Sequence, residues 1–193
     1  MDSIVLQVFL VALATDLATG LGAVPFAFVP RLSQRWQGLA YAAAGGMMVS
    51  ASVFALSEQG LRRGAAWEIV LGLLAGSLFY WWTARKVHEN DFQFGELSSK
   101  DSRQALLMLV TMFIHSIPEG IAIGVGYATG EYAFGLLLAV AIALHNVPEG
   151  IAISLPLRAK GVSVGKCAWY AILTSTPQPI AAVPAFQIGR AHV

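Results

Sequence analysis

Long apolar runs, separated by short polar breaks, fill almost the whole chain. A helix needs about 20 mostly apolar residues to cross the roughly 30 Å hydrocarbon core of a bilayer. Six runs are long enough to be such spans, and together they predict a bundle of six transmembrane helices, an all-α integral membrane protein with one transmembrane domain over residues 1–193. The predicted spans are approximately residues 4–29, 38–56, 65–83, 105–129, 133–157 and 165–189.

Composition supports this fold class and excludes one class of partner. Hydrophobic residues make up 56% of the chain and charged residues 12%, whereas soluble domains carry about 25% charged residues. The net charge is +1 and no basic stripe is present. We therefore expect a lipid bilayer around the protein and no nucleic-acid partner.

The Lys and Arg residues are distributed unevenly between the two sides of the predicted bundle. Nine of the twelve follow spans 1, 3 and 5: Arg31, Arg35, Arg85, Lys86, Lys100, Arg103, Arg158, Lys160 and Lys166. Cytoplasmic loops carry the excess of these residues. The loop 85–103 is therefore predicted to be cytoplasmic and the N-terminus to lie outside, in a plasma membrane or an inner membrane.

Asp, Glu and His residues lie deep inside the spans, away from their ends, at five positions: Asp16, His115, Glu119, His145 and Glu149. Each is costly in a bilayer, so each is a candidate for function. The last four belong to a repeat. The string His-Ser-Ile-Pro-Glu-Gly-Ile-Ala-Ile begins at residue 115, and His-Asn-Val-Pro-Glu-Gly-Ile-Ala-Ile begins 30 residues later, identical at seven of nine positions.

The spacing of the repeat suits a binding site. Its His and Glu are four residues apart, so they share one helix face. Pro118 leaves the carbonyl of Ile114 without its helical donor, and Pro148 does the same to Leu144. Consecutive spans cross in opposite directions, so proline-kinked helices 4 and 5 are predicted to form an inverted pair. Transporters commonly build substrate sites near the midplane in this way.

The residue types favour a metal ion. Two imidazoles and two carboxylates suit a borderline divalent ion such as zinc, and two ionised Glu side chains neutralise one 2+ charge. An intramembrane metalloenzyme is an alternative, but its usual strings, His-Glu-x-x-His and Glu-x-x-His, do not occur in the chain. A non-transporting fragment that binds metal, or that pairs with a full-length homologue, is a second alternative.

The repeated motif resembles that of the ZIP (ZRT/IRT-like) divalent metal transporters. Residues 19–25 resemble the first span of that family and residues 45–48 resemble the second. The resemblance implies that the four His and Glu residues bind the transported ion, with Met48 near it. The implied function is zinc transport into the cytoplasm without catalysis and without a cofactor. Fe²⁺, Mn²⁺ and Cd²⁺ stay open as substrates, as does a homodimer. The resemblance also implies that spans 1, 4, 5 and 6 move as one bundle.

The chain departs from the family pattern in charge and in length. Ser116, Asn146 and Gln178 stand where some members have Asn, Asp and Glu. In the family these positions help to form a second, adjacent metal site, so that site is expected to be weaker here. The family normally has eight spans, and we expect spans 7 and 8 to be missing through truncation or an incomplete gene model.

The charge asymmetry makes the predicted topology testable. A tag inserted in the loop 85–103 should be reachable only after cells are permeabilised, because that loop carries Lys and Arg residues of the cytoplasmic excess. A tag at the N-terminus should be labelled on intact cells. Labelling of the loop tag on intact cells would reverse the orientation.

Overall fold

The protein is helical throughout the part of the chain that the structure describes, which is residues 3–29, 33–50, 53, 61, 65–89 and 99–191. The structure is a computed structural model. Its helices are α1 (Ser3–Leu21), α2 (Pro25–Phe28), α3 (Gln34–Ser50), α5 (Ala66–Glu89), α6 (Ser99–Ala128), α7 (Tyr132–Ala159), α8 (Val164–Ser175) and α9 (Pro177–Ala191). The predicted all-α fold is confirmed.

Three helical stretches within the described residues are long and apolar enough to cross a bilayer. They are Ser3–Phe28, Ala105–Ala128 and Tyr132–Ala159, and they coincide with predicted spans 1, 4 and 5. Span 3 corresponds to the shorter apolar stretch Ala66–Trp82 in α5. Span 2 begins in α3, and most of its residues after Ser50 lie outside the described ranges.

Predicted span 6 consists of two helices instead of one. Helix α8 ends at Ser175 and α9 begins at Pro177, with Thr176 between them. Pro177 has no N–H to donate to the carbonyl of Leu173. The Thr176 hydroxyl donates to that carbonyl instead, at 2.9 Å. The break lies in the stretch Thr-Ser-Thr-Pro-Gln-Pro at residues 174–179, which the prediction of a single span passed over. By contrast, α6 and α7 run on through Pro118 and Pro148.

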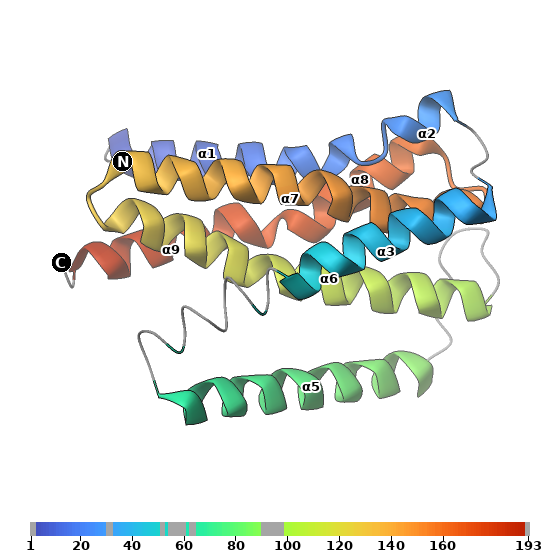
Figure 1. Cartoon of the computed structure of the whole chain (residues 1–193), viewed down its shortest axis with the longest axis horizontal. Helices are drawn as coiled ribbons and strands as arrows, with labels where there is room; N and C mark the ends of the chain where they lie inside the picture. The colour runs from blue at the N-terminus through green and yellow to red at the C-terminus, as the bar shows by residue number, and fades with distance from the viewer. Residues whose placement is uncertain are drawn as a thin grey trace.

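Within the described residues, the packed bundle consists of α1, α6, α7, α8 and α9, and α3 and α5 lie outside it. Helices α1, α6, α7, α8 and α9 contact one another, α3 contacts α7, and the main contact of α5 is with α6. Figure 1 shows α6 and α7 side by side and antiparallel, with α5 apart from the bundle. The inverted pair predicted for spans 4 and 5 is therefore present.

On the described helices many large apolar side chains are exposed, and a set of polar side chains is buried within the bundle. On α5, Leu73 and Leu78 are 62% and 64% exposed, an arrangement that lipid can cover. Polar or charged residues buried within the bundle include Thr15, Asp16, Thr19, Ser116, Asn146, Glu149, Ser154, Thr174, Ser175 and Gln178. Polar groups are costly to bury in a bilayer-spanning bundle, so these residues are candidates for function.

Small residues bring the backbones of the bundle close to one another. A Cβ atom added at Gly150 of α7 would collide with the Thr19 carbonyl of α1, and one added at Gly22 would collide with the Gly150 backbone. Added at Gly120 or Gly124 of α6, it would collide with the backbone of α9. These contacts set the short distance between helices that the candidate site requires.

The helix contact at Gly124 can be tested by adding one methyl group. Gly124→Ala should destabilise the protein by about 1–3 kcal/mol, because its methyl group would overlap the Ala182 carbonyl. Gly76→Ala on α5 is the matched control, since no described heavy atom lies within 4 Å of its added Cβ. The control should be neutral or gain up to about 1 kcal/mol from helix propensity. Equal thermal midpoints for the two variants in detergent would contradict the packing.

Candidate metal site

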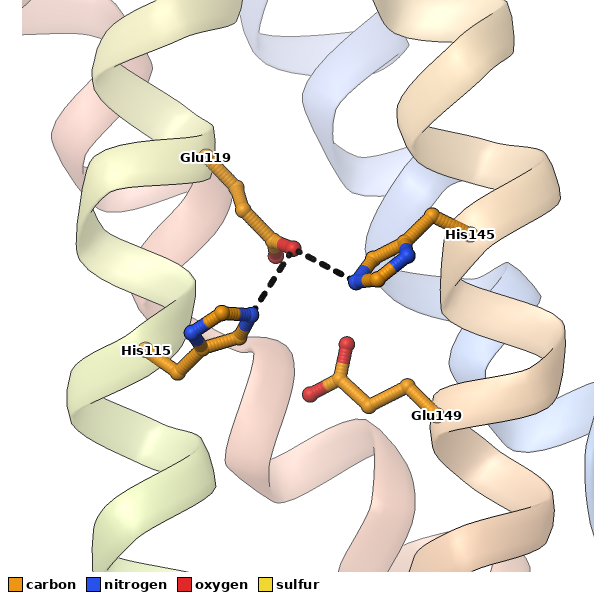
Figure 2. Close-up of side chains that lie close together, drawn as sticks. All are labelled: His115, Glu119, His145 and Glu149. Carbon is orange, nitrogen blue, oxygen red and sulfur yellow. Dashed lines mark ion pairs between the residues drawn. The ribbon is translucent and has the colours of Figure 1, made fainter. Parts of the chain in front are cut away.

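The repeated motif brings four side chains to one place. Helix α6 supplies His115 and Glu119, and α7 supplies His145 and Glu149. One potential ligand atom from each lies within 4.8 Å of the other three. Figure 2 shows all four side chains pointing from the two antiparallel helices into the space between them. Because the helices run in opposite directions, the order of His and Glu along α6 is the reverse of their order along α7.

The distances within the cluster suit a shared ion better than direct hydrogen bonds. Glu119 Oε1 lies 3.5 Å from His115 Nε2 and 3.6 Å from His145 Nε2. These separations exceed the usual length of an N–H···O hydrogen bond. Two ligands that share a tetrahedral zinc ion at 2.0–2.2 Å are about 3.4 Å apart. Glu119 Oε1 is therefore spaced from each imidazole nitrogen as two ligands of one small ion would be.

Glu149 is the most deeply buried member of the cluster. It is 1% exposed, and neither of its carboxylate oxygens has a hydrogen-bond partner among the described residues. The two His Nε2 atoms are buried and also lack a hydrogen bond there. An ionised carboxylate is very costly to bury without compensation. A cation held by Glu149 and the two imidazoles would provide it.

Comparison with known proteins identifies the family. The profile described as ZIP Zinc transporter matches residues 83–190, which contain both copies of the motif. Zinc transporter GufA of Myxococcus xanthus is 34% identical over 183 residues, which are 89% of this chain and 72% of GufA. This chain belongs to the ZIP family. It is therefore an integral membrane protein, as its apolar helices independently indicate.

Two further ZIP relatives differ in how much of them the chain covers. A candidate zinc transporter of Arabidopsis thaliana is 42% identical over 185 residues, which are 93% of this chain and 29% of that protein. Zinc transporter ZIP11 of Xenopus tropicalis is 53% identical over 87 residues, 41% of this chain and 25% of that protein. The chain thus spans less than a third of each of these relatives. Both are named as transporters and not as enzymes.

The other residues predicted from the ZIP resemblance occupy different surroundings. The Ser116 hydroxyl is buried and donates to the Met112 carbonyl of its own helix at 3.0 Å. Asn146 and Gln178 are fully buried and hydrogen-bonded to each other. Gln178 also donates from Nε2 to Glu119 Oε2. The side chain of Met48 lies outside what the structure describes, so its place near the ion stays a prediction.

Sequence reasoning missed Thr15, which links α1 to the site. Its carbonyl accepts from Asn146 Nδ2 at 2.7 Å, and its hydroxyl lies 2.8 Å from Gln178 Oε1. The signal available was Thr15 and Thr19 on one face of an otherwise apolar span. Asp16, which the sequence did single out, is 1% exposed with Oδ1 unpaired within the described chain. It does not belong to the His/Glu cluster.

Proposed function

We propose that this chain carries a divalent metal ion across the membrane, with zinc as the leading substrate. The ion is held between α6 and α7 by His115, Glu119, His145 and Glu149. The observation that carries this proposal is the buried Glu149 carboxylate. It has no described hydrogen-bond partner and lies beside two imidazoles whose Nε2 atoms also lack a hydrogen bond. Two ionised carboxylates would balance one 2+ ion, so the loaded site would be electrically neutral inside the bilayer.

The ligand chemistry favours zinc over harder ions. Two imidazoles with carboxylate oxygens suit zinc and other first-row ions, whereas calcium and magnesium prefer oxygen ligands alone. The relatives are named as zinc transporters, and this supports zinc ahead of Fe²⁺, Mn²⁺ and Cd²⁺. Inward movement to the cytoplasm, the side to which most of the Lys and Arg residues are assigned, belongs to the same proposal.

The helix arrangement is consistent with a transporter. The helices that touch or surround the site, α1 and α6 to α9, pack into one unit, and α3 and α5 contact it from outside. A unit of this kind could move against its surroundings while it carries the ion. A metal-binding chain without flux is the competing function.

Uptake by the purified chain in proteoliposomes is the direct test. Glu149→Ala should reduce zinc affinity about 100-fold or more, because removing one partner of a buried charge group costs about 3–5 kcal/mol. Flux at low external zinc should then fall to background. Glu131→Gln, in the exposed turn between α6 and α7, is the matched control and should retain wild-type flux. Zinc binding without flux in the wild type would favour the non-transporting function, and wild-type flux in Glu149→Ala would contradict the site.

Zinc affinity should depend on pH in the direction set by the imidazoles. A His ligand must be neutral, and an isolated imidazole has a pKa of about 6.5. Below that pH protons compete with the ion, so the dissociation constant should rise by roughly tenfold per pH unit for each imidazole that must lose a proton. Competition with a zinc-sensitive dye between about pH 7.5 and 5.5 measures this. A flat affinity would argue against imidazole ligation.

A further inference from the structure

A continuous chain of hydrogen bonds links the backbone of α1 to one ligand of the proposed ion. Asn146 Nδ2 donates to the Thr15 carbonyl at 2.7 Å and to Gln178 Oε1 at 3.1 Å. Gln178 Nε2 then donates to Glu119 Oε2. Asn146 comes from α7, Gln178 from the first turn of α9 and Glu119 from α6. Four helices of the bundle therefore meet in one polar connection.

The chemistry of the first link sets the direction of every later link. A backbone carbonyl can only accept, so the Asn146 atom facing Thr15 must be the amide nitrogen. The second hydrogen of that nitrogen requires an acceptor, and this assigns the facing atom of Gln178 as its oxygen. The Gln178 amide nitrogen must then face Glu119. A carboxylate accepts hydrogen bonds without donating, so the last link agrees with the first.

This series of hydrogen bonds gives the two oxygens of Glu119 different surroundings. Oε2 accepts the hydrogen bond from Gln178, and Oε1 faces both imidazoles. Both oxygens of Glu149 are buried without a hydrogen bond in the described chain. The two copies of the motif are thus nearly identical in sequence but different in surroundings. Glu119 has one oxygen available to an ion, and Glu149 has two.

We propose that Gln178 is a positioning residue that holds Glu119 as a one-oxygen ligand of the transported ion. This inference rests on the proposed function. The neutral amide supplies a donor without adding charge, so the negative charge of the site stays at two carboxylates. It also prevents Glu119 from turning both oxygens to the ion. The hydrogen bonds that Thr15 and Asn146 donate to the Gln178 oxygen keep its amide nitrogen directed toward Glu119.

The test compares Gln178→Met, Thr15→Val and Thr19→Val in the purified full chain, using zinc affinity and Co²⁺ absorption, which depends on coordination geometry. Gln178→Met retains length and loses the hydrogen bond to Glu119. It should weaken zinc binding about 10- to 100-fold, the usual effect of losing a partner that orients a ligand. The Co²⁺ spectrum should change because Glu119 is then free to offer both oxygens.

Thr15 and Thr19 form a matched pair that separates the loss of the hydrogen bond to Gln178 from a general effect on helix packing. Thr15 and Thr19 are buried on α1, and each hydroxyl has an interhelical partner at 2.8 Å, Gln178 for the first and Ser175 for the second. The Thr15 hydroxyl also lies 2.7 Å from the Ala12 carbonyl, so its one hydrogen is shared. Thr15→Val should therefore weaken zinc binding by only about 2- to 10-fold. Thr19→Val should leave affinity and spectrum unchanged.

The outcomes separate this inference from the proposed function. Wild-type affinity and an unaltered Co²⁺ spectrum in Gln178→Met would overturn the positioning role, while metal binding by the wild type would keep the proposed function. If Gln178→Met does not fold, the threonine pair decides, and equal effects of Thr15→Val and Thr19→Val on affinity would overturn the inference. Absence of Zn²⁺ and Co²⁺ binding in the wild type would overturn both proposals.

Discussion

An ionised carboxylate inside a bilayer-spanning bundle must have positive charge or several hydrogen bonds beside it. Glu149 is buried and has neither among the described residues. A cation bound between α6 and α7, as proposed above, would supply this compensation. The other features of the bundle can be read as conditions for bringing this cation and its remaining ligands to one point.

Close backbone contact is the first of these conditions. His and Glu side chains reach only a few ångströms, so helices that donate ligands to one small ion must lie near one another. Gly150 meets the backbone of α1, and Gly120 meets the backbone of α9 at Gln178. A larger residue at either glycine would push the helices apart. The glycine in each motif therefore serves packing, while the His and Glu are the proposed ligands of the ion.

The break between α8 and α9 has a related consequence. Pro177 interrupts the regular hydrogen bonding and begins α9, which places the side chain of Gln178 in its first turn, within hydrogen-bond reach of Glu119. A neutral amide there can donate to a carboxylate, whereas a second carboxyl group could donate only if it were protonated. The two copies of the motif are therefore nearly identical in sequence but differ in the hydrogen bonding of their carboxylates. Glu119 faces the end of α9 and is hydrogen-bonded, whereas Glu149 is unpaired.

Local patterns in the sequence were enough to predict the helical class, spans 1, 4 and 5, and the pairing of His115 and Glu119 with His145 and Glu149. Hydropathy depends on composition, and a four-residue spacing depends only on the helix period, so neither requires knowledge of distant contacts. The break at Thr176 was missed because hydropathy does not register a missing N–H. Only the tertiary structure decided the part played by Thr15, the direction of the Gln178 amide and the difference between Glu119 and Glu149. Hydrogen-bond partners that lie 59 to 163 residues apart in the chain are set by how the helices pack, and no local pattern contains that information.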